Sequence, residues 1–293
     1  MANYNYKSVL KGALATLGVE VKRIEHNEVI PKYFDDPVEA LLYNQGGKKA
    51  AFSCPIGKCT HYTALGFRNN DWHPFVETLK QYRSDKYLTY SRSKLKEFYT
   101  KWQPKNASDA LTGFKFPPKE FSKLPPHYMF LSPWSSLSHA EVDLDIRWWN
   151  QKDNTEHGRT DLRYPDHGWA FFGPVHPDKG ILEFDRSISL YNSLIQHGYD
   201  KSQGFVGVTI LKRGKELVYL VGGGGYHRAA ALSSLGYKHV PSTFHRNSIV
   251  DIDDACNWPQ VRSGLWTVKQ ARLYVDHLFD FNSNQWAIDM SLC

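Results

Sequence analysis

Apolar and polar positions follow their most regular pattern in the second half of the chain. Apolar runs bounded by turn residues predict four strands, at residues 181–184, 205–211, 217–221 and 240–244. Apolar residues at helical spacing predict three helices, at residues 187–197, 227–235 and 267–279. Gly198 and Gly236 follow the first two helices, and Thr267 is a suitable amino-terminal cap for the third. This order of strands and helices predicts a compact α/β unit.

The first half of the chain has a less regular pattern with more helix. Helical spacing predicts helices at residues 9–17, 37–43, 75–82 and 93–102. The first carries Lys7 and Lys11 beside its apolar face, so it either makes a weak contact with a membrane surface or, as we expect, docks on its own domain. The remaining segments are a short strand, a proline-rich irregular connector, a half-buried strand and a polar loop, at residues 19–24, 113–134, 142–148 and 150–164.

Together these elements predict an α/β (α+β) fold in two parts. Residues 166–293 are expected to form the regular α/β domain with its C-terminal helix. Residues 1–165 are expected to form a helical and irregular region, basic and rich in aromatic residues, which packs on that domain and binds an acceptor or a partner. Residues 1–150 contain 21 Lys/Arg and 15 Asp/Glu, whereas residues 151–293 contain 15 of each, so the net charge of +6 resides in the first part. Most of this excess lies between Lys80 and Lys123, a stripe that suits an anionic partner but that we expect to be solvated helix surface.

Composition narrows the class of protein. No apolar run approaches the roughly 20 residues that a membrane-spanning helix needs. The amino terminus has no secretory signal pattern, and four cysteines in 293 residues do not make a disulfide framework. These features predict a cytoplasmic globular protein.

A glycine-rich loop is the strongest candidate for a binding site. Gly222, Gly223, Gly224 and Gly225 follow a predicted strand and precede a predicted helix, so a ligand can approach the backbone closely there. The free N–H groups at the start of that helix, with the guanidinium of Arg228, are suited to phosphate oxygens. His227 can donate a further hydrogen bond or carry a proton. The loop contains neither the Gly-Lys-Ser/Thr of a P-loop nor Gly-x-Gly-x-x-Gly.

Residues 183–244 resemble the ParB/sulfiredoxin-like nucleotide-binding superfamily. Three segments carry the likeness: a helix ending in His197-Gly198, the loop and Ala-rich helix at 225–231, and a strand beginning at Val240-Pro241. Segments at 73–76, 95–104 and 258–264 are also similar to uncharacterised ParB-like proteins associated with polysaccharide-synthesis genes.

This resemblance implies a mixed-sheet domain that binds ATP or CTP with Mg²⁺. It implies that Gly224, Gly225 and Tyr226 belong to the phosphate-binding turn, that His227 and Arg228 are its basic residues, and that Arg186 reaches the nucleotide from the first strand. The sequence departs from the family at the reactive cysteine of sulfiredoxins, which is Tyr226 here, and at the acid of the kinase-like members, which is Gly224. It also lacks a helix-turn-helix after the domain, so sulfinic-acid repair and chromosome partition are not expected.

Several polar residues are candidates for catalysis. Asp185 or Glu183 could act as a general base beside a transferred phosphate, although Asp185 is the better candidate for a helix cap. Upstream, Asp166, His167 and His176 are candidate substrate contacts.

A metal site is not expected. Cys54, Cys59, His61 and His73 lack the paired spacing of structural zinc sites. Asp143 and Asp145 would share one face of the predicted strand at 142–148, and their Asp-x-Asp sequence otherwise resembles a metal–nucleotide site of glycosyltransferases.

Three functional hypotheses follow. The first is an ATP- or CTP-dependent phosphotransferase or NTP hydrolase that acts on a small hydroxylated molecule, such as an intermediate of polysaccharide synthesis, with His227 positioning the terminal phosphate. The second is a non-catalytic nucleotide sensor or assembly factor. The third, motivated by the basic stripe, is a DNA-binding protein or nuclease. The acceptor, the base and the oligomeric state are left open.

Overall fold

The computed structural model describes residues 30–68 and 71–293, so the predicted elements at residues 9–17 and 19–24 lie outside the described residues. Its centre is a six-stranded mixed sheet with the strand order β1-β2-β6-β4-β5-β3. The strands are β1 (Lys32–Phe34), β2 (Ala50–Pro55), β3 (Cys59–Thr60), β4 (Val206–Arg213), β5 (Glu216–Val221) and β6 (His239–Asp251). β4 and β5 form an antiparallel hairpin, and β6 runs parallel to β4. The predicted α/β (α+β) class is confirmed.

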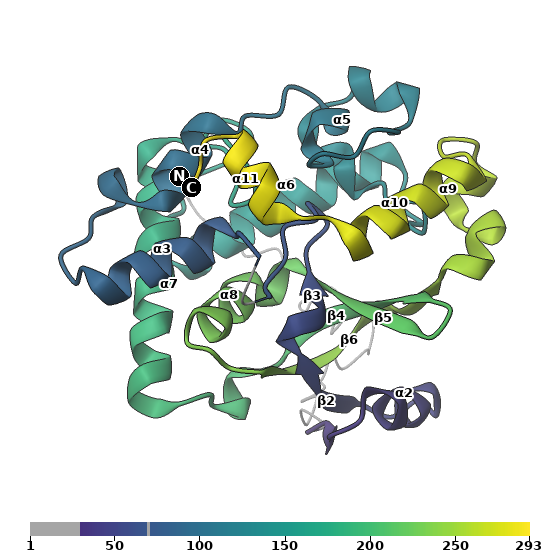
Figure 1. Cartoon of the computed structure of the whole chain (residues 1–293), viewed down its shortest axis with the longest axis horizontal. Coiled ribbons are helices and arrows are strands. Elements are labelled where there is room, and N and C mark those ends of the chain that lie inside the picture. The colour runs from purple at the N-terminus through teal and green to yellow at the C-terminus, as the bar shows by residue number, and fades with distance from the viewer. Residues whose placement is uncertain (1–29, 69–70) are drawn as a thin grey trace, which may run out of the picture.

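Most helices gather on one side of this sheet (Figure 1). They are α2 (Pro37–Gln45), α3 (Pro74–Ser84), α4 (Lys94–Lys101), α5 (Ala107–Ala110), α6 (His139–Glu156), α7 (Pro177–His197), α8 (Tyr226–Ser234), α9 (Pro259–Arg262), α10 (Val268–Asp280) and α11 (Ser283–Asp289). α8 packs against both α3 and α7 and lies between them and the sheet, whereas α2 lies beside β2 at the opposite end. The long helix α7 therefore faces the sheet only through α8.

The two predicted parts of the chain share one sheet and one core. β2, from the first part, pairs antiparallel with β6, and β3 pairs parallel with β5. The sheet curls strongly, because the Sγ atoms of Cys54 on β2 and Cys59 on β3 lie 3.5 Å apart although three strands separate β2 from β3 in the strand order. Burial of apolar side chains from both parts in one continuous cluster supplies the main stabilising free energy. The boundary at residue 165 stays a prediction, within a single core.

Many predicted elements are confirmed. The β4–β5 hairpin turns after Arg213, and α8 ends just before Gly236. Thr267 caps α10 in a capping box, in which its hydroxyl accepts a hydrogen bond from the N–H of Gln270 and the side-chain oxygen of Gln270 accepts one from the N–H of Thr267. The predicted helices of the first half correspond to α2, α3 and α4.

The strand predicted at residues 142–148 is wrong, because the segment belongs to α6. Alternating and helical patterns both place residues i and i+4 on one face, and Val142 and Ile146 are indeed buried. Leu144, which an alternating strand would bury with them, is 67% exposed. The capping box of Ser138 and Glu141 is the sequence signal that favours a helix.

Two further predictions nearby are wrong for the same reason. The loop predicted at residues 150–164 is helical as far as Glu156, and the strand predicted at residues 181–184 lies inside the 21-residue helix α7. Asp143 and Asp145 point in directions about 200° apart on α6, since successive helical residues rotate by about 100°. They therefore share no face, and Asp143 instead pairs with Arg147 at 2.8 Å.

Candidate functional site

The glycine loop connects β5 to the start of α8. Gly225 is its tightest residue, because an added Cβ would lie 2.4 Å from Cγ1 of Val206 on β4. Gly224 is exposed, with no atom within 4 Å of the position of an added Cβ. No side chain caps the amino terminus of the nine-residue helix α8. The short helical turn Gly223–Gly225 leads directly into α8, and the N–H of Gly225 donates to the carbonyl of Gly222 at 3.1 Å. Candidate donors to a ligand are therefore the N–H groups of the first turn of α8 itself, to which no side chain is hydrogen-bonded.

The side chain of Arg228, in the first turn of α8, lies between the turn at Gly224 and the turn at Gly204. Its Nη2 donates a hydrogen bond to the carbonyl of Gly224 at 3.0 Å. Its Nη1 lies 3.6 Å from the position of an added Cβ on Gly204, which has a φ of +91° that favours glycine. The hydroxyl of Tyr199 donates to the carbonyl of Gly204 at 2.7 Å. These contacts hold the guanidinium beside the loop, and the binding of phosphate by Arg228 stays a prediction.

An aromatic and basic rim continues from this turn. Phe205 follows Gly204, and its ring centroid lies 6.5 Å from that of Tyr33 on β1. The Nζ atom of Lys201 lies 3.6 Å above the Tyr33 ring, a cation–π contact. On the other side, the imidazole of His245 lies 3.8 Å from the positions that Cβ atoms on Gly207 and Gly222 would occupy. None of these rim residues was singled out from the sequence.

His227 points away from the loop and into the protein, where it contacts α7. Its Nε2 lies 2.7 Å from Oε2 of Glu183, and its Nδ1 lies 2.9 Å from Nη2 of Arg186. Because a guanidinium can only donate, Nδ1 must accept, so the proton of the neutral ring is on Nε2 and is donated to Glu183. Burial and the adjacent Arg186 lower the pKa of His227, against the opposing effect of Glu183. This histidine is a neutral connector between α8 and α7.

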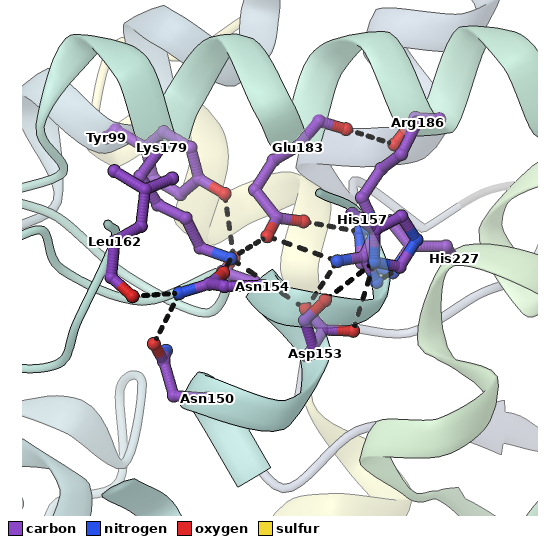
Figure 2. Close-up of polar contacts among 12 residues, drawn as sticks. Tyr99, Asn150, Asp153, Asn154, His157, Leu162, Lys179, Glu183, Arg186 and His227 are labelled. Atoms are coloured by element: carbon purple, nitrogen blue, oxygen red, sulfur yellow. Dashed lines mark hydrogen bonds and ion pairs between the residues drawn. The ribbon is translucent and has the colours of Figure 1, made fainter. Parts of the chain in front are cut away.

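Glu183 belongs to a buried ionic network that joins α6, α7 and α8 (Figure 2). Its Oε1 lies 2.5 Å from Nζ of Lys179, and both side chains are at most 1% exposed. Arg186 donates to Asp153 of α6 at 2.5 Å. Lys179 also donates to the side-chain oxygen of Asn154 at 2.5 Å. Two cations thus face two carboxylates, and each buried charge has a partner.

The network decides the ionisation of Glu183. Burial alone would raise the pKa of its carboxyl group, but the nearby Arg186, Lys179 and His227 together outweigh burial and hold this pKa well below 4.5. Glu183 is therefore a carboxylate with three partners and no exposure to solvent. This environment stabilises a charge and does not favour uptake of a proton by a general base.

The other predicted site residues lie elsewhere. Arg186 and Asp185 lie in the middle of α7, so Arg186 does not reach the site from a strand and Asp185 caps nothing; the cap of α7 is His176. Asp185 is exposed and points about 200° around the helix from Glu183, away from α8. The rings of His167 and His176 contact each other at 5.3 Å. His176 precedes Glu183 by seven helical positions, about 10 Å along the axis.

Asp166 and Tyr226 also depart from their predicted places. Asp166 is exposed in the turn that precedes His167. Tyr226 is only 1% exposed, with its ring in the core, so only its backbone can face the loop.

Lys179, Asp153 and Asn154 are the residues that sequence reasoning missed. Lys179, Glu183 and Arg186 follow the i, i+4, i+7 spacing of one helix face. The strand predicted at residues 181–184 concealed that spacing, and Asp153 and Asn154 fell in a predicted loop. A single continuous helix over α7 would have made the charged face visible.

Part of the basic stripe is paired within its own helices. Lys80 lies 2.7 Å from Glu77 on α3, and both Lys94 and Lys101 contact Glu97 on α4. Such exposed pairs each contribute at most about 1 kcal/mol. They are the expected pattern of a solvated helix surface, as the sequence predicted.

No group of three or more His, Cys, Asp or Glu side chains within residues 30–68 and 71–293 has the arrangement of a metal site. Among the same residues, no helix combines the length and the apolar content that crossing a bilayer requires. Comparison of the chain with family models, with curated proteins and with solved structures gives no match. The resemblance to the ParB/sulfiredoxin-like superfamily therefore stays a prediction.

Proposed function

We propose that the protein binds a nucleotide through its phosphate groups at the glycine loop. The observation that carries this proposal is the start of α8, which no side chain caps, beside the open space at Gly224 and with Arg228 held between Gly204 and Gly224. Backbone N–H groups at a helix start and the positive end of the helix dipole both favour phosphate oxygens. The resemblance of the loop to that of nucleotide-binding proteins supports the same proposal.

The rim of the loop supplies a place for the base. The rings of Tyr33 and Phe205 lie 6.5 Å apart between centroids, and the Nζ atom of Lys201 covers one face of Tyr33, so we expect a base to stack on Phe205 or on the other face of Tyr33. A nucleobase that stacks on such rings gains about 1–3 kcal/mol by analogy with single-stranded nucleic-acid sites. The ligand class is accordingly a nucleoside di- or triphosphate, ATP or CTP in the first instance, with Mg²⁺ accompanying its phosphates.

The geometry supports binding better than phosphoryl transfer. Of the three predicted catalytic residues, Glu183 and His227 are held in the buried network and Asp185 points away from α8. The best-supported function is therefore a nucleotide sensor or assembly factor, in which the ligand stabilises the loop and the start of α8. A phosphotransferase or NTP hydrolase is the second candidate, and it requires Glu183 or His227 to leave the network when the ligand binds.

Isothermal titration with ATP, CTP, GTP and inorganic triphosphate tests this proposal. Arg228→Ala should weaken the best nucleotide by about 10- to 100-fold, the effect of losing one charge-assisted contact of about 1.5–3 kcal/mol. Arg272→Ala, on the exposed side of α10, is the matched control and should bind as the wild type does. Absence of binding at millimolar nucleotide, or equal affinity for both variants, would refute the proposal.

Measurement of nucleotide hydrolysis distinguishes the nucleotide sensor from the phosphotransferase or NTP hydrolase. The sensor proposal predicts no release of phosphate over many hours and a change in oligomeric state or hydrogen exchange at α8 when nucleotide is added. Steady hydrolysis that Arg228→Ala abolishes and Arg272→Ala retains would instead establish the enzyme.

A further inference from the structure

Behind the first turn of α8, three buried side chains carry polar atoms that have no hydrogen-bond partner among the described residues. These atoms are the hydroxyl of Tyr226, the Nε2 of His61 and both ring nitrogens of His73. Each side chain is at most 1% exposed. A buried polar group without a partner costs about 1–3 kcal/mol, so four such atoms in one place need an explanation.

The three side chains form one cluster, here called the Tyr226 cluster. The Tyr226 ring lies 4.8 Å from that of His61 and 5.0 Å from that of His73, between centroids. Phe67, Phe75 and Phe171 also contact the Tyr226 ring, at 5.6, 5.4 and 4.8 Å. The polar atoms are thus enclosed by an apolar wall contributed by segments far apart in the sequence.

The chemistry of the cluster selects a small neutral ligand. Burial lowers the pKa of His61 to about 3. Burial, together with the neighbouring His61 and His227, also holds the pKa of His73 well below its usual range. Both rings are therefore uncharged near neutral pH and do not attract an ion.

The proton on His61 also argues against a metal. Nδ1 of His61 lies 3.0 Å from the hydroxyl of Thr63, which can donate or accept, and 3.3 Å from the backbone N–H of Thr63, which can only donate. Because the backbone N–H needs an acceptor, we assign the ring proton to Nε2. That nitrogen is then a donor without a free lone pair. The cluster contains both unpaired donors and unpaired acceptors, and water can pair with both because it donates and accepts hydrogen bonds.

We propose that the Tyr226 cluster binds ordered water inside the protein. His61 offers one donor, His73 one donor and one acceptor, and Tyr226 one of each, which makes five unfilled positions. A buried water makes about three hydrogen bonds, so one or two molecules fill them. The water joins the loop after β3, the start of α3 and the start of α8, which contribute His61, His73 and Tyr226. This inference is independent of nucleotide binding.

Oxygen-17 magnetic relaxation dispersion counts long-lived internal water in the full chain. We expect the double variant His73→Leu/Tyr226→Phe to lose the signal of one or two molecules. Tyr99→Phe is the control, because its hydroxyl donates directly to the carbonyl of Ala170 at 3.0 Å, and it should keep the wild-type signal. An unchanged signal in a folded double variant overturns the proposal.

The direction in which the single substitution Tyr226→Phe shifts the urea midpoint provides a second test, without the double variant. If water bonds to the hydroxyl, Tyr226→Phe should lower the urea midpoint, as Tyr99→Phe does. If the hydroxyl has no partner at all, its removal should raise the midpoint, because an uncompensated buried group is then lost. A raised midpoint for Tyr226→Phe overturns the proposal.

Discussion

Replacement of Glu183 by Gln should destabilise the protein strongly, although the two side chains have nearly the same shape. The change leaves Lys179, which is 1% exposed, without the negative charge that lies 2.5 Å away. The amide keeps one acceptor oxygen, so its NH2 group must face either the ammonium of Lys179 or the N–H of His227. Breaking a buried ion pair by neutralising one partner costs about 3–5 kcal/mol. The side chain of Asp153 remains 3.8 Å from Lys179, so we expect the lower end, about 3 kcal/mol.

Urea unfolding measured by circular dichroism checks this value. With a slope of about 3 kcal/mol per molar urea for a chain of this size, the midpoint should fall by about 1 M. Asp185→Asn is the matched control, because it makes the same chemical change two residues away at an exposed position, and its effect should stay within about 0.5 kcal/mol. A loss below about 1 kcal/mol for Glu183→Gln would refute the role assigned to the network.

A double-mutant cycle identifies the cause. Lys179→Met should cost less free energy in the Glu183→Gln background than in the wild type, because the uncompensated ammonium is then removed. Equal costs in both backgrounds would mean that Lys179 and Glu183 do not interact energetically.

The remaining predictions concern pH, the glycine loop and α6. Burial lowers the pKa of His61 to about 3 in the folded protein, so below pH 6.5 only the unfolded chain takes up a proton at this ring. The free energy of unfolding then decreases by up to about 1.4 kcal/mol for each pH unit. Urea midpoints should therefore fall more steeply from pH 7 to pH 5 in the wild type than in His61→Asn. Gly225→Ala should cost about 1–3 kcal/mol by overpacking, whereas Gly224→Ala should be tolerated, as thermal melting can show. Val142→Asp should unfold the protein or lower its melting temperature sharply, whereas Leu144→Asp should leave it near the wild-type value; the reverse order would restore the strand assignment.

Local signals in the sequence determined much of the fold. The β4–β5 hairpin, α8 and α10 could be predicted because their turns, caps and apolar periods all indicate the same structure. The glycine loop could be located for the same reason. The segments at 142–148 and 181–184 could not, because a short apolar run satisfies both the period of a strand and one face of a helix.

Only the tertiary structure decided what the charged residues do. Lys179 and Glu183 are neighbours on α7, but His227 and Asp153 reach their partners on α7 only because α8 and α6 pack against that helix. A carboxylate, an ammonium and an imidazole in sequence are equally compatible with catalysis and with a buried network, since the pKa of each depends on burial and on neighbours across the core. The sequence could therefore indicate a candidate phosphate site, but the packing of the helices determined which nearby residues are held in the buried network.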